Sequence, residues 1–517
     1  MRILKITTAF ILLTIALKAQ TILPTPKIFQ LKQGNFILGS KVLVAIQNKN
    51  SMVLPYLSKE VLKNTQMSVA TANTKKKADI VFITDRTLKN EAYLLDIKPG
   101  QIVIKAAGDP GFFYAVQSIY QLLLSNKSGQ LPCVYIEDEP KFQLRSFMLD
   151  SGRQYQKVAT IKKYLDMMAM LKMNTFHWHL TEGLGWRIEI LKYPKLTSKG
   201  AFVDGAAERQ GFYTQKEIRE LIKYAAARNI NIIPEIDMPG HAEAALIAYP
   251  QFSCFGDTIR LKEGQGFSDN IFCAGKTGTL AFLKDVLDEV CDLFPSAYIH
   301  VGGDEAPKAN WNRCSDCQRV IKSEKLENSG ELQSYFSSQI ANYLLSKNKK
   351  AVFWEDVMYH DKYRLPKNVV VHWWNWRGHK DEGMKKAIKY NHEVINGTNY
   401  YTYLNFPVSP WRGYETDRTF DIRDVYENNP SAKNTDPNLT LGMSTALWTD
   451  YNVTEDKIDR RLFPRIFALT EQMWHKGEAL PFDQFYNNVQ KIRSNFEKKR
   501  YQFGPGLKSE VQTDYQW

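Results

Sequence analysis

The sequence lacks the features that mark a membrane-spanning or nucleotide-binding protein. After the apolar run from Ile6 to Leu17, no stretch approaches the roughly twenty apolar residues that a membrane-spanning helix needs. No GxGxxG or Walker pattern follows the first predicted strand, which removes the usual reason for a doubly wound nucleotide-binding sheet. Lys and Arg are scattered, with a tight run in TKKK at 74–77, so the net charge of +13 indicates a solvated surface and no nucleic-acid partner.

The first twenty residues are predicted to be a secretory signal peptide. Arg2 and Lys5 precede the short apolar run, and Ala19-Gln20 provides a small-residue cleavage region. We therefore expect a secreted or periplasmic protein without an integral membrane segment after signal removal. No cysteine stands near the predicted cut, so a lipid anchor has no support.

Cysteine is scarce, with 6 residues in a chain of 517. In an exported chain these cysteines permit disulfides, and we predict one between Cys254 and Cys273, which bracket a Gly-rich loop. Cys314 and Cys317 form a lone CxxC motif, and no second CxxC or HxxxH supplies the remaining ligands of a structural zinc site. A disulfide or two idle thiols are the prediction here, and we expect no metal and no cofactor.

Residues 21–140 are predicted to form a small α+β domain. AYLLDI-KPG-QIVIKA has the form of a hairpin with a Pro-Gly turn, and residues 111–124 carry apolar side chains at helical spacing. The acidic EDEP at 137–140 is predicted to be an exposed connection to the next domain. At the other end, residues 481–517 are predicted to be a helix followed by an irregular tail.

Residues 141–480 show short apolar strands that alternate with longer helical segments, which is typical of a parallel sheet built from βα units. Eight strands are predicted, namely SFMLD, NTFHWH, INIIPEID, AYIHVGG, AVFWED, VVVHWW, EVIN and GMSTALW. Eight such units predict an α/β fold, a (β/α)8 TIM barrel preceded by the small α+β domain. An open doubly wound sheet is the alternative.

Polar and aromatic side chains come at or after the end of every predicted barrel strand. They are Asp150, Arg153, His177, His179, Glu182, Asp237, His241, Asp304, Glu305, Trp354, Glu355, Trp373, Trp374, Tyr401, Tyr403, Trp448 and Asp450. In a barrel these positions share the C-terminal rim, where active sites are built. Packing alone does not explain eight strands that each end in this way.

Tryptophan is concentrated at this rim, with 6 of the 11 residues between 354 and 448. Indoles stack on the apolar faces of a pyranose, and Arg153 or Asp450 can hydrogen-bond its hydroxyls. A carbohydrate therefore fits the rim best. Glycoside hydrolysis normally uses two carboxyl groups that flank the bond, which the adjacent Asp304 and Glu305 cannot easily do, so their spacing indicates a variant mechanism.

Eight strings carry a family resemblance across nearly the whole predicted barrel. They are RSFMLDSGR, KMNTFHWHL, GWRIEILKYPKLTSKGA, IIPEIDMPGHAEA, HVGGDE, YTYLNF, GMSTALW and FPRIFALTEQMW. These strings resemble the family-20 glycoside hydrolases, the β-N-acetylhexosaminidases. The resemblance implies an exo-acting, retaining enzyme that removes terminal β-linked N-acetylglucosamine from glycans, with N-acetylgalactosamine left open.

The resemblance also implies substrate-assisted catalysis, in which the 2-acetamido oxygen of the sugar attacks the anomeric carbon and forms an oxazolinium intermediate. Glu305 is then the general acid and later the general base, and Asp304 holds the acetamido group and faces its positive charge. Tyr403 is expected to hydrogen-bond the acetamido oxygen. A neighbouring carboxylate and a desolvated pocket are expected to raise the pKa of Glu305.

Supporting and binding roles follow from the same resemblance. His241, supported by Glu182 and Asp237, is expected to couple to the catalytic Glu, and its place at the start of a helix favours its neutral form. Arg153 is expected to bind the hydroxyls of the non-reducing end.

Tryptophans are expected to enclose the acetamido methyl and the sugar ring. The residues are Trp354, Trp448 and one of Trp373 or Trp374.

Three positions depart from the family pattern. Glu182-Gly183 stands where two Asp residues are usual, so the support of His241 is open to rearrangement. Asp450 replaces a Glu that contacts the outer hydroxyls, which shortens its reach by about 1.5 Å. Asn405, a known variant of an Asp, both donates and accepts hydrogen bonds.

Two other functions stay open at this point. His177, His179, Asp237, Asp304 and Glu305 are possible ligands of a metal-dependent barrel hydrolase, because HxH on a barrel strand is a metal-binding pattern. A non-catalytic glycan-binding protein on a degenerate hydrolase scaffold is the other alternative. The natural glycan, its linkage and the oligomeric state are not determined by the sequence.

Overall fold

The computed structural model describes most of the chain. The described residues are 22–48, 50–62, 67–72, 74–126, 129–203, 207–261, 268–360, 364–376, 378–408, 420–433, 435–450 and 453–512. The predicted signal peptide lies outside them. None of the described helices combines the length and the apolar character that crossing a bilayer requires.

The N-terminal domain is a seven-stranded mixed sheet with the strand order β1-β7-β5-β6-β4-β2-β3. Its strands are β1 (Ile28–Ile37), β2 (Lys41–Ala45), β3 (Ser68–Thr71), β4 (Ile80–Thr84), β5 (Tyr93–Lys98), β6 (Gln101–Ala106) and β7 (Gln130–Asp138). The helix α2 (Asp109–Ser125) packs against β5, β6 and β7, and its residues 111–122 are buried. The predicted hairpin is present as the antiparallel pair β5 and β6.

The second part of the chain is a closed barrel of eight parallel strands in the order β12-β13-β14-β15-β16-β17-β8-β9. These are β8 (Leu144–Asp150), β9 (Thr175–His179), β12 (Asn231–Glu235), β13 (Tyr298–His300), β14 (Lys350–Trp354), β15 (Val370–Trp373), β16 (Glu393–Asn396) and β17 (Thr440–Leu447). The predicted barrel is confirmed, and each of the eight predicted strands overlaps one of these.

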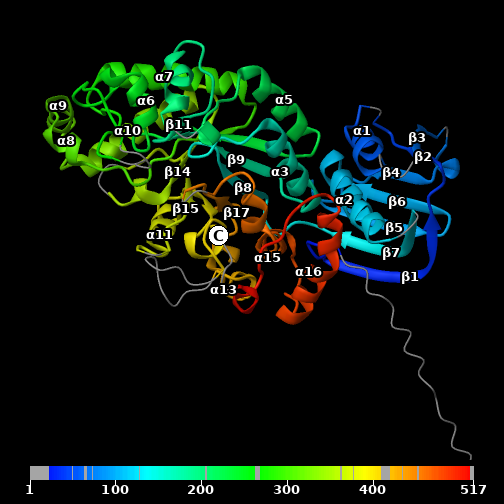
Figure 1. Ribbon diagram of the computed structural model, residues 1–517. Helices are drawn as coiled ribbons and strands as arrows, with labels where there is room; N and C mark the ends of the chain where they lie inside the picture. The colour runs from blue at the N-terminus through cyan, green and yellow to red at the C-terminus, as the bar shows by residue number, and fades with distance from the viewer. Residues whose placement is uncertain are drawn as a thin grey trace, which may run out of the picture.

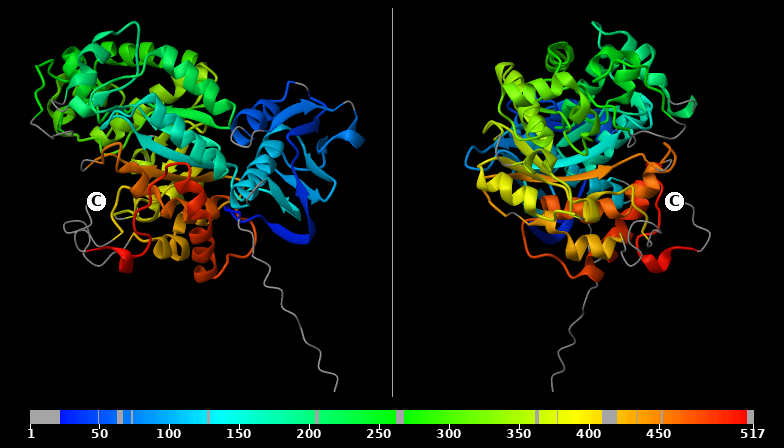
Figure 2. Two further views of the ribbon diagram at one scale, coloured as in Figure 1. Left: turned by 45° about the vertical axis from the view of Figure 1, so that its right-hand side comes forward. Right: turned by 90° about the vertical axis from the view of Figure 1, so that its left-hand side faces the viewer.

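Helices cover the outside of the barrel, as Figure 1 shows. The longer ones are α3 (Val158–Met170), α5 (Gln215–Ala226), α7 (Thr277–Leu293), α9 (Ser315–Ser323), α10 (Ser329–Ser346), α11 (Glu382–Lys389), α13 (Ile422–Asn428), α15 (Arg465–Trp474) and α16 (Phe482–Glu497). Between them lie the shorter α6 (Glu243–Ala248), α8 (Ala309–Arg313) and α12 (Asn399–Thr402). In Figures 1 and 2, α16 lies against α2, so the C-terminal helix contacts the N-terminal domain.

The connection between the two parts contains one buried acid, Asp138, where the sequence analysis predicted an exposed connection. Asp138, at the end of β7, is 1% exposed, and its carboxylate accepts hydrogen bonds from Lys172 Nζ at 2.7 Å, Tyr93 Oη at 2.8 Å and Trp474 Nε1 at 2.9 Å. The exposed-connection prediction was wrong for Asp138, because its charge is neutralised by Lys172 from the barrel, whereas Glu137, Glu139 and Pro140 are partly exposed. Asp138 therefore joins the sheet to two barrel segments.

Asp138→Ala is expected to lower the free energy of unfolding by about 3–5 kcal/mol, because it leaves the fully buried Lys172 ammonium without its counter-charge. Urea unfolding followed by tryptophan fluorescence measures the change. Asp96→Ala is the matched control, since Asp96 pairs with Lys32 at the surface and about 0–1 kcal/mol is expected. Equal losses in the two variants would contradict the buried pair as an anchor.

The predicted disulfide between Cys254 and Cys273 is wrong. All six cysteines lie in the described part of the chain and are free thiols. Cys254 and Cys273 face Cys314 and Cys317 as well as each other, so the sequence pair is part of a larger cluster.

Candidate active site

A cavity of about 230 Å³ opens at the C-terminal ends of the barrel strands. It is lined by Arg153, Asp304, Glu305, Trp354, Trp374, Asn399, Tyr403, Asn405, Phe406, Trp448 and Asp450. Nine of these eleven were predicted from the sequence as catalytic or substrate-binding residues. A larger cavity of about 560 Å³ at the opposite end of the barrel is lined by residues such as Glu91 and Glu139, whose carboxylates are already paired with cations.

The segment after β13 brings both acids to this cavity because the chain bends at two glycines. Gly302 and Gly303 have φ angles of +63° and +98°, and a Cβ on Gly302 would lie 1.6 Å from Asp237 Oδ1. Only glycine fits these two positions. Glu305 itself has a φ of +45°, a strained value for a non-glycine residue that ends the strand direction and turns its side chain outward.

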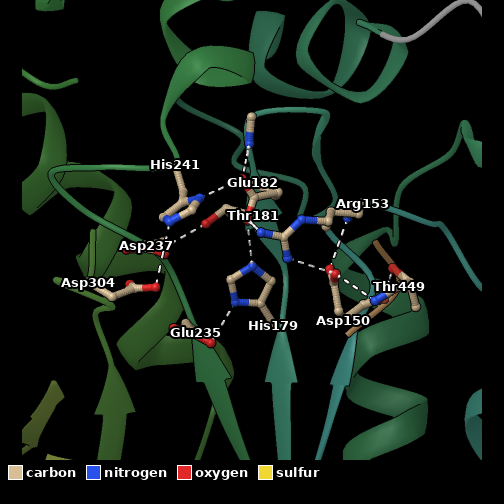
Figure 3. A network of polar contacts seen from close by, with 12 residues as sticks. Asp150, Arg153, His179, Thr181, Glu182, Glu235, Asp237, His241, Asp304 and Thr449 are labelled. Atoms are coloured by element: carbon tan, nitrogen blue, oxygen red, sulfur yellow. Dashed lines mark hydrogen bonds and ion pairs between the residues drawn. The ribbon is translucent and has the colours of Figure 1, made fainter. Parts of the chain in front are cut away.

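A chain of charged side chains leads from Arg153 to Asp304, as Figure 3 shows. Arg153 Nη2 lies 2.9 Å from Glu182 Oε2, and the other oxygen of Glu182 lies 2.7 Å from His241 Nδ1. His241 Nε2 in turn lies 3.6 Å from Asp304 Oδ2 and 3.8 Å from Glu305 Oε2. The Glu182-Gly183 departure therefore leaves the support of His241 intact, since the longer Glu182 side chain reaches it.

His241 is a cation in this arrangement, which corrects the expectation that it is neutral. Burial alone would lower the pKa of His241, but the carboxylates of Glu182 and Asp304 raise it to about 9. The helix that follows, α6, begins two residues later, and its dipole is outweighed by a carboxylate at 2.7 Å. Burial also opposes ionisation of Glu182, yet Arg153 and His241 hold the pKa of Glu182 well below its usual range.

The two acids differ in exposure. Only 12% of the Asp304 side chain is exposed, against 49% for Glu305. Burial and the nearby Asp237 raise the pKa of Asp304, while the His241 cation opposes that shift. About half of the Glu305 side chain is exposed at the pocket mouth, so the desolvation expected from the sequence is only partial.

Asp237 lies behind the acid pair and does not line the cavity. Its Oδ1 accepts a hydrogen bond from the backbone N–H of Gly303 at 3.2 Å, and its own N–H donates to Thr181 Oγ1 at 2.8 Å. Asp237 thus holds the glycine turn that carries Asp304. Asp237 therefore supports the site through its hydrogen bond to the Gly303 backbone, whereas the sequence analysis expected it to support His241.

Aromatic rings wall the pocket. The rings of Trp374 and Tyr403 are nearly parallel, with a 9° interplanar angle and centroids 6.4 Å apart. The ring centre of Trp448 lies 5.9 Å from that of Tyr403 and 5.9 Å from that of Trp354. The buried Trp448 Nε1 has no hydrogen-bond partner among the described residues, so it remains a donor for a bound ligand.

Trp373 does not line the pocket, which corrects its assignment as a substrate-binding residue. Its indole Nε1 donates to the Lys380 carbonyl at 2.6 Å, and its ring packs against Trp376. Trp373 and Trp374 are adjacent at the end of a strand, so their side chains point to opposite faces. Trp374 is therefore the pocket residue of the pair.

The outer edge of the pocket is polar. Asp450 Oδ1 accepts a hydrogen bond from Asn405 Nδ2 at 3.1 Å, and the Arg153 guanidinium lies 5.1 Å from the Trp448 ring centre. Burial raises the pKa of Asp450 to about 6. Arg461 donates to the Asn405 carbonyl at 2.6 Å and so fixes the loop that carries Asn405.

Two acids that the sequence analysis did not select hold this site together. Glu235 binds His177, His179 and His300, and it accepts a hydrogen bond from Trp354 Nε1 at 2.8 Å.

Asp356 accepts from the Glu305 backbone N–H at 3.2 Å and from Trp374 Nε1 at 2.7 Å. Glu235 could have been identified from the sequence. Residues two apart on a strand point to the same face, so Glu235 shares the face of Asp237, which the sequence analysis had selected.

The ligand set proposed for a metal-dependent hydrolase does not assemble. His177 stacks on His300 with ring centres 4.4 Å apart, away from the acid pair. Among the described residues, no group of possible ligand atoms within 4.8 Å of one another contains the proposed five. The geometry therefore offers no single point at which these five residues could meet one ion.

Comparisons with known proteins agree with this geometry. The family model "Glycosyl hydrolase family 20, catalytic domain" matches residues 142–477, and "Glycosyl hydrolase family 20, domain 2" matches residues 19–139. A β-hexosaminidase of Porphyromonas gingivalis is 37% identical over 415 residues, covering 75% of this chain and 51% of the relative. A β-hexosaminidase of Vibrio furnissii is 33% identical over 474 residues, covering 87% of this chain and 76% of the relative. The chain thus spans about half the length of the first relative.

Solved structures extend the likeness over nearly the whole chain. The β-N-acetylhexosaminidase of Bacteroides fragilis superposes with a TM-score of 0.91 at 52% identity, covering 96% of this chain and 100% of that one. The exo β-N-acetylglucosaminidase of Vibrio harveyi, solved with N-acetylglucosamine, gives a TM-score of 0.84 at 26% identity, covering 95% and 79%. With both domain matches, the barrel and the rim in place, this chain belongs to glycosyl hydrolase family 20.

Proposed function

We propose that this protein is an exo-acting, retaining β-N-acetylhexosaminidase that hydrolyses terminal β-linked N-acetylglucosamine through an oxazolinium intermediate. The observation that carries the proposal is the pairing of a buried Asp304 with a half-exposed Glu305 at one side of a tryptophan-walled pocket. Two adjacent carboxyls cannot easily flank a glycosidic bond from opposite faces, which favours a nucleophile supplied by the substrate. The names of the relatives support the same activity.

The first step divides the work between the two acids. The acetamido oxygen of the bound sugar attacks the anomeric carbon and forms a C–O bond while the bond to the leaving oxygen breaks. Glu305, at the pocket mouth, gives its proton to that leaving oxygen. The Asp304 carboxylate accepts a hydrogen bond from the acetamido N–H and faces the positive charge that develops on the oxazolinium ring.

The second step reverses the proton transfer. Water attacks the anomeric carbon, Glu305 takes the proton from that water, and the oxazolinium ring reopens to the acetamido group. Two inversions at the anomeric carbon give net retention. Tyr403 is placed at the pocket wall to donate a hydrogen bond to the acetamido oxygen and so align it for attack.

The outer end of the pocket supports exo action. Arg153, Asp450 and Asn405 line one end of a small cavity and present charged and amide groups to the hydroxyls of a terminal sugar. Burial of Asp450 and its hydrogen bond to Asn405 fix these groups before the substrate binds. A glycan chain that continued past this end would meet Arg153, whose guanidinium is held by the buried Glu182.

The decisive experiment compares 4-nitrophenyl N-acetyl-β-glucosaminide with 4-nitrophenyl β-glucoside, which lacks the acetamido group. We expect kcat/KM for the glucoside to be lower by at least about 10³-fold, because an intramolecular nucleophile is worth effective molarities of roughly 10⁵–10⁸ M. Proton NMR of the fresh product should show the β-anomer first. Similar rates on the two substrates, or an α-anomeric first product, would overturn the proposal.

The pH dependence should report His241. As pH rises through about 9, His241 loses its positive charge, and the Asp304 carboxylate loses its cationic partner, so kcat/KM is expected to fall about tenfold per pH unit. The same raised pKa stabilises the fold fully below about 6.5, and this contribution is lost as pH rises through about 9.

The measurement is kcat/KM from pH 5 to 10, with activity remeasured at pH 7 to exclude unfolding. His241→Gln should lower activity and remove the alkaline limb. His379→Gln, at an exposed ion pair with Glu382, is the matched control and should keep it. An unchanged alkaline limb in His241→Gln would assign that limb to another group.

We also propose that the protein is exported to the periplasm or beyond. The proposal rests on the charged, apolar and small-residue order of residues 1–20. Mass spectrometry of the protein recovered from fractionated cells is expected to find a chain that lacks these residues outside the cytoplasm. A chain retaining Met1 in the cytoplasmic fraction would contradict export.

A further inference from the structure

Four of the six cysteines meet at one point in the fold. The Sγ atoms of Cys254, Cys273, Cys314 and Cys317 all lie within 4.8 Å of one another, and all four side chains are buried. The lone CxxC of the sequence thus acquires two further sulfurs, supplied by a segment that precedes it by about forty residues or more. The mechanism proposed above uses none of them.

The spacing of the sulfurs fits a tetrahedrally coordinated metal ion and not a disulfide. Cys273 Sγ lies 3.7 Å from Cys314 Sγ and 3.6 Å from Cys317 Sγ. Four sulfurs bound tetrahedrally at the usual zinc–sulfur distance of about 2.3 Å are about 3.8 Å apart. A disulfide would bring one pair to about 2.05 Å. We propose that these four cysteines, as thiolates, bind one structural Zn²⁺.

The surroundings of the cluster suit a closed structural site. Ile271, Trp311 and Leu332 are buried against the four cysteines and shield them from water. A Cβ on Gly275 would lie 2.2 Å from the Asp316 carbonyl carbon, so the two cysteine-bearing loops touch at a glycine. Four thiolates fill a tetrahedral shell and leave no open position for a substrate, so the ion is structural and not catalytic.

The cluster lies where a crosslink would steady the catalytic residues. Cys254 and Cys273 lie after α6 in the connection between β12 and α7, and His241 lies in the same connection before α6. Cys314 and Cys317 come shortly after Glu305, and Ala306, the residue next to Glu305, packs against the cluster. Trp311 Nε1 donates a hydrogen bond to the Phe272 carbonyl at 2.9 Å, so the two connections also contact each other directly. A zinc ion would fix the loop of Asp304 and Glu305 to the loop of His241.

Metal analysis of the purified full chain tests the site. Inductively coupled plasma mass spectrometry is expected to find one zinc per chain, and the denatured intact mass is expected to show four unpaired cluster thiols. Cys254→Ser and Cys314→Ser should each lose the zinc. Cys133→Ser in β7 and Cys291→Ser in α7 are matched controls that should retain it, because neither thiol belongs to the cluster.

Three results would overturn the proposal. The first is a zinc-free protein whose mass is 4 Da below that of the fully reduced chain, which means two disulfides. The second is a protein with free thiols and no metal after growth with added zinc. The third is iron in place of zinc. Removal of the zinc with a strong chelator should lower Tm by about 5 °C or more, and added Zn²⁺ should restore it. An unchanged Tm would contradict a structural role. These readouts do not depend on the proposed hydrolase activity.

Discussion

Asp304→Asn is expected to lower kcat on 4-nitrophenyl N-acetyl-β-glucosaminide by about 10²–10³-fold while KM changes little. The amide keeps the shape of the carboxyl group and its place 3.6 Å from His241 Nε2, but it removes the negative charge. That charge matters most in the transition state, where the acetamido group becomes an oxazolinium cation. Burial and the nearby Asp237 raise the pKa of Asp304, whereas the His241 cation and the forming oxazolinium cation favour its ionised state.

The comparison of kcat with KM separates this role from simple binding. Asp288→Asn on α7, where the carboxylate pairs with Lys347 at the surface, is the matched control and should leave both constants unchanged. A large rise in KM at constant kcat would show that Asp304 binds the ground state and does not stabilise the transition state.

Glu305→Gln is expected to lower kcat/KM by about 10²–10⁴-fold for a disaccharide substrate, because general acid catalysis is worth that much when the leaving oxygen is a poor one. The loss should be much smaller for a dinitrophenyl leaving group, which departs without a proton. This dependence on the leaving group follows from the position of Glu305 at the pocket mouth, with 49% of its side chain exposed.

The two variants should therefore respond differently to the leaving group. Asp304→Asn acts on the acetamido side and should lose similar factors with both substrates, whereas Glu305→Gln should not. Glu324→Gln, at an exposed position after α9, controls for the loss of one carboxylate. Equal losses for both leaving groups in Glu305→Gln would contradict the acid assignment.

The barrel was predictable because its signals are local. Each strand, from SFMLD to GMSTALW, is a short apolar run followed by a helical pattern, and this periodicity is written in consecutive residues. The pocket followed from the same signal, since parallel strands in a barrel place their C-terminal ends on one rim. Asp304 and Glu305 could be placed there because Gly302 and Gly303 stop the strand just before them.

Side-chain direction was not predictable at the adjacent Trp373 and Trp374. Both follow the same strand, and only the course of the backbone decides that Trp374 stacks beside Tyr403 while Trp373 bonds to Lys380. Charge state was equally hidden at His241. Its pKa depends on Glu182, which is 59 residues away in the sequence and 2.7 Å away in space.

The sequence by itself determined the architecture, the rim and the acid pair, because helix and strand periods and glycine turns act over a few neighbouring residues. Only the tertiary structure decided which tryptophan enters the pocket, that His241 is charged, that Asp138 is buried against Lys172, and that four cysteines share one centre. Each of these depends on distances between residues far apart along the chain. Those distances are set by packing, and no local pattern records them.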